Sequence, residues 1–308
     1  MENDLSVLVL HRAELHECLL AAVPPDLVRT GATVVDVAQG KSSATVSYRT
    51  DHENEGVLTA ALVVGDDGIR SRVRGSVLPE AGAPRYAGFT TWRGVTDEPY
   101  PLDQQSESWG RGAVFGLTQL PDERVYWFAT ANAPPGTHHT DERDEVLRRF
   151  GSWHAPVGDV VRSTPSESVL KHDIYSHPRP LSPFAVGRVA LLGDAAPAVT
   201  PNLGQGACLA LEDAVILAAE LAKGEPVERA LAGYDADRRP RAEQISKMSE
   251  RMSRLAQVDN PAITAMRGVL MAMIPSKVAA ISLARTVAWP SESVKPAGCG
   301  AGREGETP

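Results

Sequence analysis

The chain has 308 residues, 43% of them hydrophobic, and a formal net charge of −8 at pH 7. This is enough apolar material for one large core or two lobes, and the acidic balance without basic runs argues against nucleic-acid binding. No charged leader precedes an apolar segment, and charged residues interrupt the late apolar stretch 262–289, so we expect neither a secretory signal nor a membrane span.

The first predicted element is an amphipathic helix at His11–Leu20. Its apolar residues recur at helical spacing, and Pro24-Pro25 stops it. Arg12 lies in the first turn, where a solvated surface arginine is one interpretation. Three strands are then predicted, at 32–37, 44–48 and 57–64.

The segment 61–74, ALVVGDDGIRSRVR, combines a strand, a turn and a helix start. Leu62–Val64 is a short apolar run of the kind found in buried parallel strands. Asp67-Gly68 ends this strand, and a helix can begin at Ser71. An Asp-Gly pair by itself is a common turn, so this segment gains meaning only from its neighbours.

From about residue 86 the pattern becomes alternating and aromatic, which predicts a mainly antiparallel sheet. Its strands are expected at 89–95, 113–119 and 124–130, with a helix at 141–150. The glycines between Trp109 and Gly116 belong to a hairpin of this sheet and not to a phosphate-binding loop. His138-His139 has no distant partner at metal-binding spacing, so no metal site is expected.

The segment 187–214 is the most informative part of the chain. A buried strand at 189–192 runs into Gly193-Asp194 and a turn of small residues, and Gly204-Gln205-Gly206 then opens a helix over 206–223. Glycines and a helix N-terminus bring bare backbone and partial positive charge against a ligand, while Asp194 can accept hydrogen bonds from hydroxyl groups. This arrangement suits a cofactor that carries a polyol and negative charge. A charged helical run at 227–254, bent at Pro240, follows it.

The segment 187–214 resembles the GD motif of the FAD-dependent monooxygenases of the para-hydroxybenzoate hydroxylase type, the flavoprotein aromatic hydroxylases. The resemblance implies that Asp194 holds the ribityl chain of FAD and that Pro201, Gly204 and Gly206 lie along the flavin ring. The family usually has a histidine where this chain has Pro197.

Two further segments resemble the same family in the same order. Asp67 and Gly68 match its DG motif, which approaches the FAD pyrophosphate and ribose and the nicotinamide cofactor, and Arg74 closes that pattern. Arg12 matches the arginine that reaches the phosphates of the cofactor. The strand, GxGxxG and helix with which the family normally begins do not precede Arg12.

The expected fold is therefore α/β (α+β): an FAD/NAD(P)-binding parallel-sheet lobe truncated at its N-terminus, an inserted and mainly antiparallel substrate lobe, and C-terminal helices. The expected divisions are 1–85 and 179–294 for the FAD-binding lobe, 86–178 for the substrate lobe, and a disordered tail at 295–308.

The resemblance implies that NADH or NADPH reduces FAD, and that O2 then adds at flavin C4a to give a hydroperoxide. One oxygen atom is transferred to a small substrate, aromatic or polycyclic. The lobe residues that could face this substrate are Trp92, Arg93, Trp109 and Phe115. No side chain is singled out as catalytic, and nothing indicates an oligomeric state. The flavin halogenases share this fold, but their WxWxIP signature is missing.

Two alternatives remain open. The chain can be a remnant that lacks activity or serves as a binding module, because loss of a βαβ unit exposes apolar surface and removes phosphate contacts. Its start can also be misplaced, with the missing part encoded upstream or on a companion chain. Three scattered cysteines fit a cytoplasmic protein without disulfides.

Overall fold

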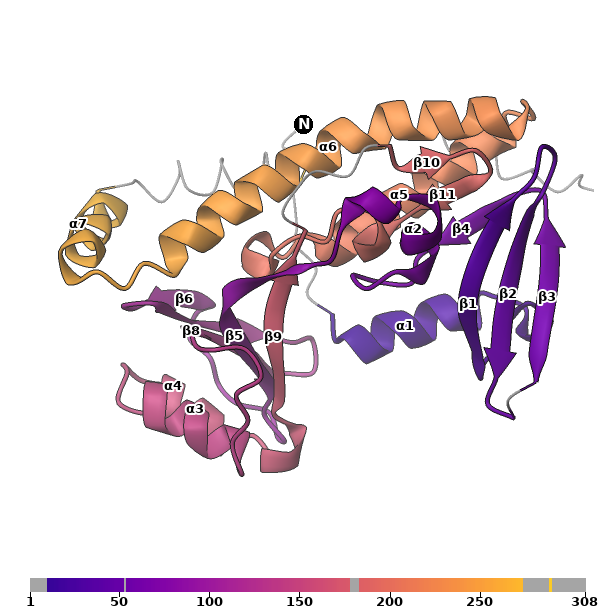
Figure 1. Cartoon of the computed structure of the whole chain (residues 1–308). Coiled ribbons are helices and arrows are strands. Elements are labelled where there is room, and N and C mark those ends of the chain that lie inside the picture. The colour runs from indigo at the N-terminus through magenta and orange to yellow at the C-terminus, as the bar shows by residue number, and fades with distance from the viewer. Residues whose placement is uncertain (1–9, 53, 178–182, 274–287, 290–308) are drawn as a thin grey trace, which may run out of the picture.

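The computed structural model describes residues 10–52, 54–177, 183–273 and 288–289 (Figure 1). Three sheets and a set of longer helices near the C-terminus form a mixed α/β fold, as predicted. The tail predicted to be disordered, 295–308, lies outside the described residues. In the part of the chain that the structure describes, no helix combines the length and apolarity needed to cross a bilayer.

The first sheet is an antiparallel meander next to helix α1 (Arg12–Ala21). Its strands are β1 (Ala32–Gln39), β2 (Ala44–Thr50) and β3 (Glu55–Ala60), in that order. The prediction of a single strand at 57–64 is wrong, because β3 ends at Ala60 and the next strand, β4 (Val63–Gly65), belongs to a different sheet.

The second sheet carries the predicted parallel strand pair. Its order is β10 (Ala185–Val186), β11 (Val189–Leu191) and β4, with β11 parallel to β4. Helices α2 (Arg72–Val77), α5 (Gly206–Ala222) and α6 (Val227–Ala256) surround it, and α6 continues through Pro240. Its core includes Val189, Leu191, Leu209, Ile216, Leu231 and Tyr234.

The third sheet has five antiparallel strands in the order β6, β7, β8, β5, β9. Its strands are β5 (Arg85–Val95), β6 (Ser106–Trp109), β7 (Ala113–Gln119), β8 (Val125–Asn132) and β9 (Leu170–Ser176). Helices α3 (Glu142–Phe150) and α4 (Val157–Arg162) lie on the side of this sheet away from α5 and α6 (Figure 1). β6 and α4 were not among the predicted elements.

The remaining elements are short. Helix α7 (Pro261–Ala272) follows α6, and Asn260 caps it by accepting from the backbone N–H of Ala262 and Ile263. Single 3-10 turns occur at η1 (Pro25–Leu27), η2 (Pro79–Ala81), η3 (Ser166–Ser168), η4 (Gly193–Ala195) and η5 (Pro201–Leu203).

Helix α1 forms as predicted, but it has no buried residue. Leu19 and Leu20 on α1 are exposed, as are Val64 on β4 and Leu211 and Val215 on α5. Isolated exposed apolar residues are ordinary on a protein surface, and these five lie on one strand of the second sheet and on two helices.

Candidate functional site

The strands β4 and β11 bring the two predicted motifs together. Gly65 pairs with Leu191 in parallel register, and the backbone N–H of Leu192 donates to the carbonyl of Gly65 at 2.9 Å. Both strands therefore end at one edge of the sheet, where Asp66-Asp67-Gly68 follows β4 and Gly193-Asp194 follows β11. Ligands in open α/β sheets bind at this carboxyl edge.

Asp194 presents an open carboxylate at this edge. Asp194 is exposed, while Ala195, Ala196 and Pro197 beside it are buried. Surrounding protein raises the pKa of Asp194, and the positive charge of Arg12 opposes this effect. The tertiary structure thus brings Arg12 close to Asp194, although 182 residues separate them in sequence.

The side chain of Asp67 caps helix α2. Its carboxylate accepts from the backbone N–H of Arg72 at 2.7 Å and of Val73 at 3.1 Å, and from the hydroxyl of Ser71. The side chain is therefore engaged with the N-terminus of α2. Contact of Asp67 with a cofactor stays a prediction.

Sequence reasoning did not single out Asp66, which lies next to Gly193 at the ends of the two strands. Burial raises its pKa, and the negative charges of Asp194 and Asp67 raise it further. A Cβ on Gly193 would lie 2.7 Å from Oδ1 of Asp66, so glycine is needed where the two strand ends meet. The Asp-Asp pair at a strand end was the available signal.

Glycines line the open side of the site. Gly68 and Gly204 have left-handed backbone, with φ of +79° and +64°. A Cβ built on Gly68, Gly204 or Gly206 meets no protein heavy atom within 4 Å, so each faces space that a ligand can fill. The first backbone N–H groups of α5, which begins at Gly206, have no partner within the helix and carry its positive dipole end.

A buried ionic cluster supports the turn at Gly193. The backbone N–H of Gly193 donates to Oδ2 of Asp213 at 3.0 Å, and Nε of Arg238 donates to Oδ1 of the same carboxylate at 2.7 Å. Arg238 also pairs with Glu212 at 2.8 Å, and Arg241 with Glu212 at 3.1 Å. Sequence reasoning missed this cluster, although acidic pairs in one helix and arginines in the next were visible.

The four residues predicted to face a substrate divide between the two faces of the third sheet. Trp92 and Phe115 are 0% and 1% exposed and pack with Phe150 and the helices α3 and α4. They were predicted as residues that could face a substrate, and the structure places them on the face of the sheet that α3 and α4 cover. Arg93, one residue on from Trp92, projects from the other face.

His172 lies on that other face together with Arg93. Burial lowers the pKa of His172, and the positive charges of Arg93, Arg12 and Lys171 lower it further. Thr91 pairs with His172 in the strand register, and Arg93 follows two residues later on the same face. Trp109 lies beneath the guanidinium of Arg267, 5.2 Å from its ring centre. Arg93 and Trp109 remain candidates for substrate contact.

Among the described residues no group of three or more His, Cys, Asp or Glu is arranged to hold a metal ion. The site chemistry is that of an organic cofactor: hydroxyl acceptors, glycine-lined space and a helix N-terminus.

Comparisons with known proteins agree with this geometry. The FAD binding domain family matches residues 16–249. Aurachin C monooxygenase/isomerase of Stigmatella aurantiaca is 40% identical over 273 residues, which are 88% of this chain and 70% of that protein. The 2-heptyl-3-hydroxy-4(1H)-quinolone synthase of Pseudomonas aeruginosa is 35% identical over 89% of this chain and 71% of its own length.

A solved structure has the same fold. Klebsiella pneumoniae HpxO, complexed with FAD and uric acid, superposes with a TM-score of 0.81 at 26% identity, covering 90% of this chain and 71% of that one. The site geometry, the matched domain and these relatives lead to one conclusion: the chain belongs to the family of FAD-dependent monooxygenases.

Proposed function

We propose that this chain binds FAD at the edge formed by β4 and β11, and that it uses NADH or NADPH and O2 to hydroxylate a small aromatic or polycyclic substrate. The observation that carries the proposal is the exposed carboxylate of Asp194 at this edge, together with the open space at Gly204 and Gly206, where α5 begins. Bound FAD would supply the electron transfer and oxygen chemistry, for which side chains alone have no equivalent.

The residues present fit such a cofactor. Asp194 can accept hydrogen bonds from the ribityl hydroxyls, and Arg12 carries the positive charge that a phosphate needs. The free backbone N–H groups at Gly206 would stabilise negative charge at the nearer edge of the flavin ring. Asp67 would contribute indirectly, by holding the N-terminus of α2 toward the site.

The substrate would lie between this edge and the face of the third sheet that carries Arg93. Arg93 makes no hydrogen bond or ion pair with another described residue, and its charge lowers the pKa of His172 and opposes the rise in the pKa of Tyr126. A cation between an imidazole and a phenol favours a ring with an acidic oxygen. The named ligand of HpxO is uric acid, and the relative from Pseudomonas aeruginosa is named for a hydroxyquinolone.

The first test is the visible spectrum of the desalted chain. A retained flavin band near ~450 nm supports the proposal. The Asp194→Ala variant should then lose flavin by at least about tenfold in Kd, the size expected for a charge-assisted hydrogen bond. Asp103→Ala removes an exposed carboxylate from the loop before β6 and should retain flavin.

One observation favours a second possibility, that the chain alone is a remnant without firm FAD binding. The exposed apolar side chains of α1, β4 and α5 described above leave the cofactor lobe only partly covered. A colourless protein that also fails to take up added FAD would support this possibility and contradict the first. NAD(P)H oxidation coupled to product formation would contradict the remnant.

A further inference from the structure

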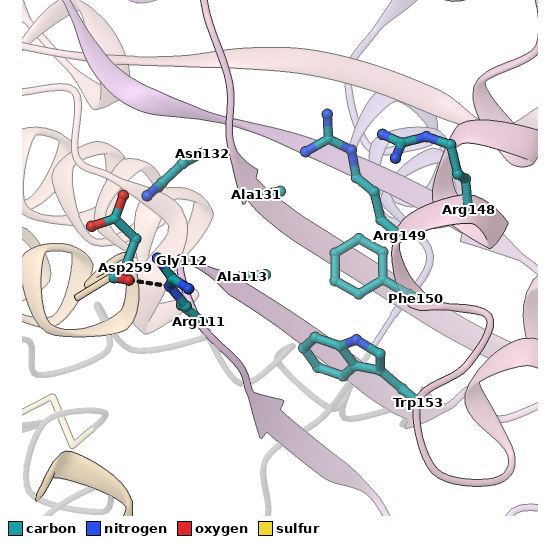
Figure 2. Close-up of a pocket in the computed structure, with 10 residues that line it drawn as sticks. All are labelled: Arg111, Gly112, Ala113, Ala131, Asn132, Arg148, Arg149, Phe150, Trp153 and Asp259. Atoms are coloured by element: carbon teal, nitrogen blue, oxygen red, sulfur yellow. Dashed lines mark hydrogen bonds between the residues drawn. The ribbon is translucent and has the colours of Figure 1, made fainter. Parts of the chain in front are cut away.

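A second cleft lies away from the proposed flavin site, at the rim of the third sheet on the side of α3. It has a volume of about 500 Å³. Arg148, Arg149, Phe150 and Trp153 form one wall, and Arg111, Asn132 and Asp259 form the other (Figure 2). The volume falls in the range of small-molecule sites.

The floor of the cleft is hollow because two small residues face each other across the strands. Ala113 on β7 pairs with Ala131 on β8, whereas the rows beside them carry the large side chains Phe115 and Trp127. Trp153 packs edge to face on Phe150 at 5.0 Å; Phe150 is 1% exposed, whereas Trp153 is only partly buried. A flat ring can therefore lie against the exposed part of Trp153 on this wall.

The guanidinium groups have spare donors. The carboxylate of Glu145 accepts hydrogen bonds from Nε of Arg149 and from both Nε and Nη2 of Arg148. These bonds hold both arginine side chains in place. The two terminal nitrogens of Arg149 and the remaining one of Arg148 make no hydrogen bond with any residue in the described ranges. Arg111 donates from Nε to the backbone carbonyl of Asp259. Its two terminal nitrogens likewise make no hydrogen bond with any residue in the described ranges. An anion between the walls would meet cations from both sides.

The opposite wall also offers acceptors on a fixed backbone. The backbone N–H of Gly112 donates to Val258 at 2.8 Å, and the side-chain amide of Asn132 donates to Gln257 at 3.0 Å. Arg267 donates to the carbonyl of Gly110 at 2.7 Å. This leaves the Oδ1 of Asn132 and the exposed carboxylate of Asp259 to accept from ligand hydroxyl or amino groups.

We propose that this cleft binds a phosphate-bearing purine nucleotide. The phosphate would lie between Arg111 and the Arg148–Arg149 pair, the base against Trp153, and the ribose hydroxyls or base amine on Asp259. A plain fatty acid has no hydrogen-bond donor that could pair with the carboxylate of Asp259. A neutral aromatic molecule has no negative charge to pair with the three arginines. Such a nucleotide is either the adenosine end of the nicotinamide cosubstrate or a free nucleotide.

Calorimetric titration of the full chain with AMP, ribose 5-phosphate, adenosine and NADPH tests the proposal without any need for bound FAD. We expect saturable AMP or NADPH binding with Kd below about 1 mM. Ribose 5-phosphate and adenosine should bind more weakly, because the first lacks the base and the second lacks the phosphate. Tighter binding of NADPH than of AMP identifies the cosubstrate as the source, and the reverse order identifies a free nucleotide.

Two variants locate the binding. Arg148→Gln and Arg111→Gln should each weaken nucleotide binding by about tenfold or more, the effect of losing a charge-assisted contact. Arg148 is 67% exposed, so its replacement leaves the fold intact. Arg162→Gln is the matched control, since Arg162 is an exposed arginine on α4 that pairs only with Asp159. Absence of saturable binding, or equal affinities in Arg148→Gln and Arg162→Gln, would overturn the proposal.

Discussion

Nη1 of Arg74 donates to the carbonyl of Ala195 at 2.9 Å, which ties α2 directly to the turn that presents Asp194. The other arm of the same guanidinium donates to the carbonyl of Ile69. Arg74 is 3% exposed, and its pKa is lowered by burial while the charge of Asp67 opposes this. One buried arginine therefore holds both cofactor motifs in place.

Replacing Arg74 with methionine should destabilise the fold and loosen the proposed FAD site. Two buried carbonyls would lose their donor, at about 1–3 kcal/mol each. Urea unfolding measures the loss, and flavin fluorescence titration measures the site. Arg72→Met is the control on the same helix, because the Arg72 side chain is exposed. Equal free energies of unfolding for the two variants would show that the hydrogen bonds of Arg74 do not stabilise the fold.

Gly204→Ala should reduce FAD affinity more than it reduces stability. The left-handed backbone costs a non-glycine residue about 1 kcal/mol, and the new methyl group would occupy space assigned to the flavin. Overpacking of that size weakens binding by about tenfold. Gly224→Ala is matched, since Gly224 has φ of +71° and open space but lies at the far end of α5. Flavin Kd values that change equally in both variants would contradict the assignment of Gly204.

His177 should make the protein less stable in mild acid. Burial, together with the positive charge of Arg74, lowers the pKa of His177 from 6.5 to about 4. The folded state therefore keeps the ring neutral while the unfolded chain takes up a proton, so stability falls as the pH drops from 6.5 toward 4. Between pH 7 and pH 5 this one group removes about 1–2 kcal/mol.

His177→Gln should flatten that part of the pH profile. Urea unfolding at pH 7 and pH 5 compares the two proteins, and His16→Gln on exposed α1 serves as the control. A wild-type slope that persists unchanged in His177→Gln would assign the acid sensitivity to other groups.

Asp213→Ala should be among the most damaging substitutions in the α5 helix. It removes the acceptor of the Gly193 N–H and leaves Arg238, 2% exposed, with only part of its ion pairing. Breaking a buried ion pair from one side costs about 3–5 kcal/mol. Asp237→Ala removes an exposed carboxylate beside Arg238 and should change stability by less than about 0.5 kcal/mol. Chemical denaturation of both variants distinguishes these outcomes, and a mild Asp213→Ala phenotype would refute the supporting role.

The sequence alone determined the family, the mixed α/β fold class and the parallel pairing expected of the segments 61–74 and 187–214. The reason is local. Gly193-Asp194 follows a short apolar strand and precedes a helix that begins after Gly204-Gln205-Gly206, and this combination is specific. The spacing of apolar residues within the segment predicts which part is strand and which is helix. Segments of this kind carry their structural information within about ten residues, so they remain readable without the rest of the fold.

Only the tertiary structure decided which side chains meet. Alternation places Trp92 and Arg93 on opposite faces, but it does not say which face α3 covers, and the helix buried Trp92. The use of Asp67 as a cap for α2, and the burial of Arg238 against Asp213, likewise depend on contacts between separate segments. Long-range pairing of charges is set by the packing of elements, and neither periodicity nor spacing within one element encodes it.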